Sequence, residues 1–108
     1  MDAVPPRILD PFLEAADAVA RERPEVDVAT ARELMAEVAE MLHNGLVLDH
    51  LDEHDHAVAV AHLAADLTAP DPTEAVRARA TAIADDTRLH DPEGVRGAYL
   101  VVIQILGL

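Results

Sequence analysis

The sequence predicts an all-α fold, a compact bundle of about five short helices in a single domain over residues 1–108. A chain of this length holds one hydrophobic core. Hydrophobic residues make up 51% of the chain and aromatic residues only 2%, so that core has to be built from Ala, Val, Leu and Ile. Ala favours helix more than any other residue because it loses no side-chain entropy there. Three Asp-Pro pairs, each followed closely by Glu, indicate helix starts: Asp10-Pro11, Asp71-Pro72 and Asp91-Pro92.

The first two helices are predicted from apolar residues at helical spacing and from residues that end a helix. The first is expected from about Pro11 to Arg23, because Pro24 ends it and one stripe is apolar: Phe12, Ala16 and Val19. The second is expected to start near Asp27 and to end at Asn44-Gly45, since both residue types tolerate the left-handed conformation that commonly ends a helix. Its apolar face contains Ala31, Leu34, Met35, Val38, Met41 and Leu42.

The third segment, from about Leu46 to Leu67, changes its apolar face along its length. The first half groups its apolar residues on one side: Val47, Leu48, Leu51 and Val58. The second half groups them on the opposite side: Val60, Leu63 and Leu67. The helix therefore either bends or breaks near Glu53 to His56, or its second half is covered on two sides.

Two further helices are predicted after the second and third Asp-Pro pairs. One runs from about Pro72 to Thr87 on an apolar stripe of Val76, Ala80 and Ile83. The other runs from Pro92 to Leu108 and is apolar nearly all round after Arg96, which is typical of a central helix. Its β-branched residues would also suit a buried strand, but no second segment offers that strand a partner.

Charge and composition exclude several classes of partner. The formal net charge is −13, from 21 acidic residues and 8 Arg, and the chain has no Lys. Such a field repels nucleic-acid backbones and anionic membrane surfaces, whereas a basic protein surface is a compatible partner. The acidity can equally reflect composition and serve solubility. The apolar run at the C-terminus falls far short of the roughly 20 residues needed to span a bilayer. With no cysteine and no secretion signal, a cytoplasmic protein is expected.

The stretch from Asp49 to His56 contains seven side chains that could bind a metal ion. On a helix His50 and His54 are one turn apart, and Glu53 and His56 have the Glu-x-x-His spacing of carboxylate-bridged metal sites. A divalent-metal site is therefore predicted at His50, Glu53, His54 and His56. The same residues fit a solvated polar face, or a cluster that titrates near neutral pH.

A second set of acidic residues carries a resemblance to a known family. Glu37-x-x-Glu40 followed by Asp52-x-x-Asp55 resembles the paired acidic motifs of the all-α MazG-like nucleotide pyrophosphohydrolases, over about a fifth of the chain. The resemblance implies that Glu37, Glu40, Asp52 and Asp55 hold Mg²⁺ against a nucleotide triphosphate. The family has Glu at the first position of its second motif, and Arg77 and Arg79 would replace its phosphate-binding Lys. The alternative is that Glu33, Glu37 and Glu40 form the wet side of an amphipathic helix.

No set of residues is complete enough to require catalysis. The absence of Ser excludes a Ser-His-Asp site, and no Gly-rich phosphate loop is present. The apolar surface around the last segment exceeds what four short, Ala-rich helices would cover. We therefore expect a small, acidic, non-catalytic protein-interaction or regulatory module that self-associates, most simply as a homodimer. The nucleotide pyrophosphohydrolase and the divalent-metal-binding protein are the alternatives.

Overall fold

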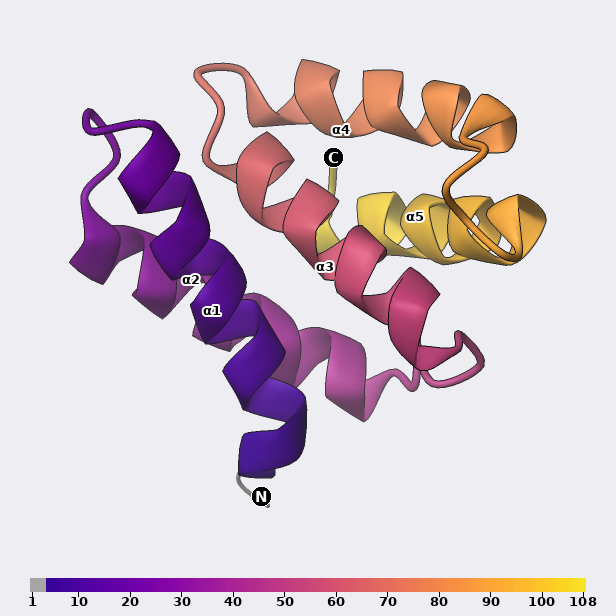
Figure 1. Cartoon of the computed structure of the whole chain (residues 1–108), viewed down its shortest axis with the longest axis horizontal. Coiled ribbons are helices and arrows are strands. Elements are labelled where there is room, and N and C mark those ends of the chain that lie inside the picture. Colours follow the sequence, from indigo (N-terminus) through magenta and orange to yellow (C-terminus); the bar gives the residue numbers. More distant parts are fainter. Residues whose placement is uncertain (1–3) are drawn as a thin grey trace.

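The computed structural model describes residues 4–108, which form a compact all-α bundle (Figure 1). Residues 1–3 lie outside the described residues. They belong to the N-terminal segment in which the sequence indicates no secretion signal. Within the described part there are five α-helices, one 3₁₀ turn and no strand. The predicted fold class is confirmed, and the last segment is a helix rather than a strand. The elements are α1 (Pro6–Glu22), α2 (Val28–Asn44), α3 (Glu53–Leu67), α4 (Pro72–Ala82), η1 (Ile83–Asp85) and α5 (Pro92–Leu106).

The helices form two pairs joined by α3. Helix α1 packs along α2, helix α4 packs along α5, and α3 contacts both α1 and α4 from its place between the two pairs (Figure 1). Ala59 and Ala64 on α3 are fully buried, and such small side chains let neighbouring helices approach on more than one side. The prediction that the C-terminal helix is central is therefore wrong, because α3 has that place.

The start of α1 corrects the sequence prediction. The helix begins at Pro6 instead of Pro11, because the carbonyl oxygen of Pro5 accepts the first helical hydrogen bonds, from the N–H groups of Ile8 and Leu9. Pro6 has no N–H to leave unpaired at this position. Pro11 lies inside the helix, where its ring removes one hydrogen bond to the preceding turn. The Asp-Pro signal at this site is overridden by an earlier proline pair.

The starts of α2, α4 and α5 are capped as predicted. Asp27 accepts a hydrogen bond from the backbone N–H of Thr30 at 3.0 Å, and Asp71 accepts one from that of Glu74 at 3.2 Å. Asp91 accepts one from the N–H of Gly94 at 3.1 Å. Each cap satisfies a donor that has no partner within its own helix.

The end of α2 lies where the sequence places it, but the geometry differs. Gly45 has a right-handed conformation with φ −88°, and Leu46 is the residue with positive φ, at 54°. A Cβ on Gly45 would lie 3.2 Å from Val47 and 3.6 Å from Ile105. Gly45 is therefore suited to this turn by the close approach of neighbouring side chains, not by a left-handed backbone.

The predicted break in the third segment is confirmed and lies just before Glu53. Residues 45–51 form turns, and Asp52 caps α3 by accepting a hydrogen bond from the N–H of Asp55 at 2.7 Å. Val47 and Leu48 in these turns are buried, so the apolar residues of the first half reach the core without being helical. Helix α4 ends at Ala82, earlier than predicted, and continues as η1.

The core is aliphatic apart from Phe12 and Tyr99. Tyr99 on α5 is 1% exposed, and its hydroxyl donates a hydrogen bond to Oδ2 of Asp66 at 2.9 Å. The guanidinium of Arg79 donates to the same carboxylate at 3.1 Å. This group links α3, α4 and α5 in the interior. Among residues 4–108, no helix has both the length and the apolar character needed to cross a membrane.

Candidate functional site

The predicted metal-binding histidines each contact a different part of the chain. His50 donates a hydrogen bond to the carbonyl oxygen of Gly94 at 3.2 Å, and His54 donates one to that of Arg88 at 2.8 Å. His56 is half-buried with its ring edge-on to Phe12. Glu53 is exposed. Burial in the apolar core lowers the pKa of His56. These four side chains therefore do not form one ligand set in this structure.

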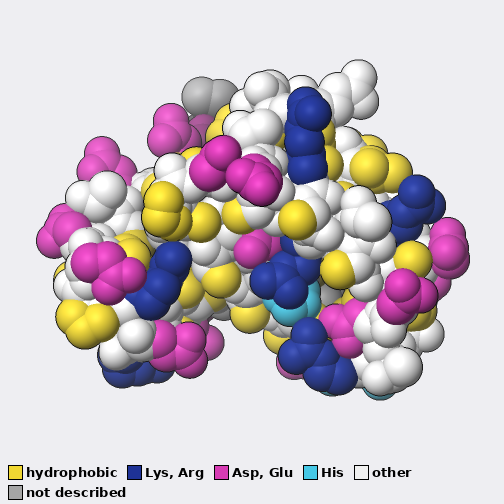
Figure 2. Space-filling view, turned by 90° about the horizontal axis from the view of Figure 1, so that it is seen from above, with side chains coloured by type: hydrophobic (Ala, Val, Ile, Leu, Met, Phe, Trp, Pro, Cys, Tyr) yellow, Lys and Arg dark blue, Asp and Glu magenta, His cyan; other side chains and the backbone are white. Residues whose placement is uncertain are grey.

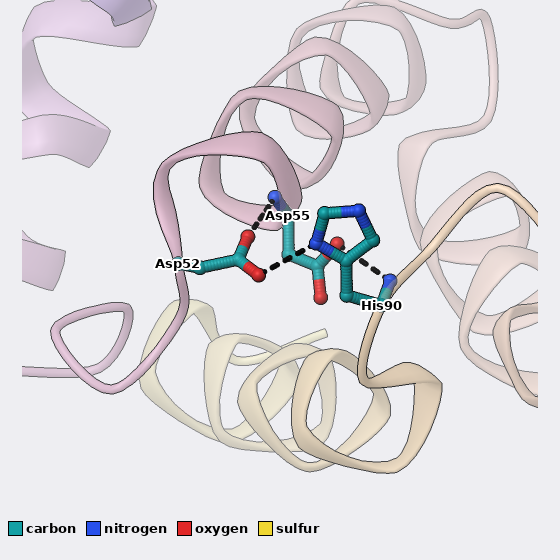
Figure 3. A group of neighbouring side chains, drawn as sticks. All are labelled: Asp52, Asp55 and His90. Atoms are coloured by element: carbon teal, nitrogen blue, oxygen red, sulfur yellow. Dashed lines mark hydrogen bonds and ion pairs between the residues drawn. The ribbon is translucent and has the colours of Figure 1, made fainter.

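A different group brings three potential ligands together (Figure 3). Among residues 4–108, the one set of at least three such side chains with ligand atoms within 4.8 Å of one another is Asp52, Asp55 and His90. Asp55 is 1% exposed, and its two carboxylate oxygens accept hydrogen bonds from the N–H groups of His90, at 2.9 Å, and Asp91, at 2.8 Å. Oδ2 of Asp52 lies 2.8 Å from Nδ1 of His90.

The electrostatics of this group favour an ion pair between Asp52 and His90. The hydrogen bond from the backbone N–H of Asp55, aided by His90, lowers the pKa of Asp52. The hydrogen bond to Asp52 raises the pKa of His90. The His54 ring stacks on the His90 ring with centroids 4.4 Å apart. Both carboxylate oxygens of Asp55 are held by backbone N–H groups at the start of α5, so we interpret the group as a junction that fixes the start of α5 to the start of α3.

Sequence reasoning did not find this junction because its members are far apart in the chain. His90 lies 38 residues from Asp52. The available signal was His90-Asp91-Pro92, a helix start directly preceded by a residue that can pair with a carboxylate. Nothing in the spacing of this sequence indicates which carboxylate that residue meets.

The four carboxylates of the pyrophosphohydrolase motif are not gathered around one point. Glu37 and Glu40 lie on α2 outside the group that contains Asp52 and Asp55. Glu37 is exposed and Glu40 is partly exposed, which matches the wet side of an amphipathic helix.

The two arginines that would replace the family's phosphate-binding Lys are engaged elsewhere. Arg77 donates to the carbonyl oxygen of Leu108, and Arg79 pairs with Asp66. The structure thus brings together half of the proposed Mg²⁺ set: Asp52 caps α3, and Asp55 binds the backbone directly before α5.

A hollow of about 340 Å³ lies between the turn after α1 and the turn after α3. Its lining is largely apolar, with Leu34, Leu67 and Pro70 among its residues. The guanidinium of Arg23 contributes to its wall, where it donates to Thr68 and to the carbonyl oxygen of Ala65. This guanidinium joins the ends of two helices, and no polar group in the wall identifies a ligand.

The outer side of α5 is the main unpartnered apolar surface. Six large hydrophobic side chains are exposed in residues 4–108, and four lie on α5 or on the turn beside it: Leu46 (63% exposed), Leu100 (47%), Val101 (42%) and Ile105 (41%). We call these four residues and Gly97 the α5 face. Beside it is a hollow of about 390 Å³ whose wall includes Leu46, Gly97 and Val101. The C-terminal helix is thus buried on one side only, not all round.

The α5 face differs in charge from the rest of the surface. No charged side chain occurs between Gly97 and Leu108, although the chain has a net charge of −13. Figure 2, seen from the α4 side, shows acidic and Arg side chains interspersed among apolar ones. The α5 face therefore combines exposed apolar side chains that carry no charge with Glu93 and Arg96 beside them, as an apolar interface core is bordered by a polar rim.

Comparison of the chain with protein-family models, curated proteins and solved structures finds no match. The class of protein is therefore defined by the fold and surface alone: a small all-α bundle whose C-terminal helix exposes an apolar face. Function has to be argued from that face and from the polar groups described above.

Proposed function

We propose that this protein is a non-catalytic, cytoplasmic helical interaction module that associates through the α5 face, first of all with itself. One observation carries the proposal: four large apolar side chains are exposed together on and beside one helix. Burying an aliphatic side chain of this size contributes about 1.5–3 kcal/mol when the burial is complete. Burying the α5 face against a partner would therefore contribute a hydrophobic free energy of association, because these side chains stay exposed in the isolated chain.

The polar groups support a non-catalytic role. Both oxygens of Asp55 accept backbone hydrogen bonds, Asp66 binds Tyr99 and Arg79, and Asp52 caps α3. Each of these carboxylates has a structural partner, and those of Asp55 and Asp66 are buried. The acidic exterior would favour a further partner with a basic surface, because complementary charge speeds encounter, and it would disfavour nucleic acid. A regulatory role would operate through such a partner.

The test is the oligomeric state over a range of protein concentrations, by light scattering and analytical ultracentrifugation. We expect a reversible dimer whose dissociation constant rises by more than about 30-fold in Val101→Glu, because dissociation frees a charge that the interface would bury. Val28→Glu is the matched control. Val28 on α2 is 45% exposed and Val101 is 42% exposed, but only Val101 belongs to the α5 face. A strict monomer at every concentration would contradict the proposal.

The enzymatic alternative has its own assay. Under our proposal, a panel of nucleotide triphosphates with Mg²⁺ gives no pyrophosphate release. Release that requires Mg²⁺ and disappears in Glu40→Gln would replace an interaction module with a pyrophosphohydrolase, since Glu40 belongs to the carboxylate set implied by the resemblance.

The metal-binding alternative is tested by calorimetry with Zn²⁺, Fe²⁺ and Ni²⁺. We expect no binding heat that depends on His50 or His54, because the two rings bond to different carbonyl oxygens. A heat that is lost in the His50→Ala, His54→Ala double variant would establish a metal site there. A heat that is lost only in His90→Ala would place the site at the junction of Asp52, Asp55 and His90.

A further inference from the structure

We infer that the partner of the α5 face is a second copy of this chain, packed with its α5 antiparallel to the first about a two-fold axis at Val101. In this arrangement Ile105 of each copy enters the hollow beside Gly97 of the other. The inference rests on the proposed function and adds to it a partner, an orientation and a register.

The spacing of three residues gives the face its symmetry. Gly97, Val101 and Ile105 follow one another at intervals of four, so they form one row along the helix. Gly97 and Ile105 each lie about 6 Å from Val101 along the helix axis, in opposite directions, because the rise is about 1.5 Å per residue. A two-fold axis at Val101 therefore brings the smallest residue of the row opposite the largest. Such a self-complementary patch is what a two-fold dimer requires.

No contact among residues 4–108 requires a glycine at position 97. A Cβ on Gly94 would lie 2.3 Å from Oδ2 of Asp91, so a side chain there would have to shift the carboxylate that caps α5. A Cβ on Gly97 would meet nothing within 4 Å. Gly destabilises a helix interior relative to Ala, and this chain uses Ala freely in its helices. A glycine beside a hollow is useful when a backbone or side chain of another molecule has to approach the helix closely there.

The distribution of charged residues favours a second copy over a basic partner at the α5 face. A basic partner would be held by acidic side chains within the contact. The row from Gly97 to Ile105 has none, and the acidic residue in the wall of the hollow beside it is Glu93. Two chains that each carry −13 repel at long range, but the residues of the row that meet here are uncharged, with Glu93 at the edge of the hollow. Salt screens charges separated by more than about 10 Å at 0.1 M, so the dimer should become tighter as salt is added. A contact with a basic partner would weaken instead.

The chain has no cysteine, so single cysteines test the register directly. Val101→Cys should form a covalent dimer under mild oxidation, because the two copies of residue 101 face each other at the axis. Val28→Cys is the control of equal exposure and should remain monomeric on a non-reducing gel. Both variants should keep the helical circular dichroism spectrum of the parent chain.

A mixing experiment gives the sharper result. Gly97→Cys alone and Ile105→Cys alone should cross-link poorly, because the two copies of either residue lie about 12 Å apart along the axis, beyond the reach of a disulfide. An equimolar mixture of the two variants should form a heterodimer, recognised by its mass, at least about tenfold faster.

The outcomes separate the inference from the proposed function. A dimer by light scattering in which Gly97→Cys cross-links with itself as fast as the mixture, or Val101→Cys no faster than Val28→Cys, would overturn the register and leave the interaction module standing. A chain that is monomeric at every concentration and cross-links at neither pair would overturn both.

Discussion

The two ends of α5 differ in how far their groups are covered by the rest of the chain. At the N-terminal end, the backbone N–H groups of His90 and Asp91 are bound by Asp55, and Asp91 caps the helix. In the C-terminal half, Val101 and Ile105 remain exposed, and so does Leu46 beside them. The backbone N–H groups at the start of α5 find hydrogen-bond acceptors within the chain, whereas the apolar side chains of its C-terminal half are only partly buried. The N-terminal end therefore anchors α5 to the rest of the fold, and the C-terminal half is where the association we propose would take place.

The largest effect is expected at the N-terminal end, from Asp55→Ala. This change removes the acceptor for two backbone N–H groups at the junction of α3 and α5. Leaving such donors without a partner costs about 1–3 kcal/mol each, so the free energy of unfolding should fall by about 3 kcal/mol. Urea denaturation followed by circular dichroism measures it.

Glu53→Ala is the control for this change, because Glu53 is an exposed carboxylate on the same first turn of α3. Its effect should stay within about 0.5 kcal/mol. A loss of less than about 1 kcal/mol in Asp55→Ala would mean that the N-terminal end of α5 does not depend on this carboxylate.

The second prediction concerns the glycines at the two ends of the comparison. Gly97→Ala should raise the free energy of unfolding of the monomer by about 1 kcal/mol, because Ala is the better helix former and its Cβ would meet nothing within 4 Å. Gly94→Ala should raise it less than Gly97→Ala does, because the Cβ would force the capping carboxylate of Asp91 to shift. Thermal and urea unfolding at a concentration below dimer formation provide the measurement.

A larger gain in Gly97→Ala than in Gly94→Ala is the informative outcome. Gly97 is then retained at a cost to the stability of the monomer, as an interface position would be. If Gly97→Ala destabilises the monomer, Gly97 has an unrecognised role within the fold and the argument from its open surroundings fails.

Sequence reasoning succeeded where the signal was local. Asp71-Pro72 and Asp91-Pro92 start helices because the cap and the proline act within four residues. The same signal failed at Asp10-Pro11, because Pro5 and Pro6 begin the helix one turn earlier. A helix that already exists tolerates a proline near its start better than the pattern assumes.

The candidate site was less predictable because it depends on pairing between distant segments. Asp52 and Asp55, which the sequence motif groups with Glu37 and Glu40, lie beside His90 in the structure instead. The apolar excess of the C-terminal segment was visible in the sequence. Which side of it faces the core was not, since that depends on where α4 and the turn at Leu46 pack.

The smallest expected effect is a pH dependence at the junction. Pairing with Asp52 raises the pKa of His90, so the folded state binds the His90 proton more tightly than the unfolded chain does. This contribution to stability is fully present below the unfolded pKa of about 6.5 and is lost as the pH rises through the higher folded value. An NMR titration should give a pKa for His90 above 6.5 that falls in Asp52→Asn.

Other histidines act in the opposite direction and have to be separated from this effect. Burial lowers the pKa values of His56 and His62, so their protonation disfavours the folded state as the pH falls through 6.5 and below. The stability of the whole chain therefore mixes both signs, and the difference between the parent and His90→Asn isolates the junction. That difference should be larger at pH 5.5 than at pH 8.5, because only protonated His90 forms the ion pair with Asp52. An unchanged difference would mean that His90 binds Asp52 through a neutral hydrogen bond, with no part for its charge.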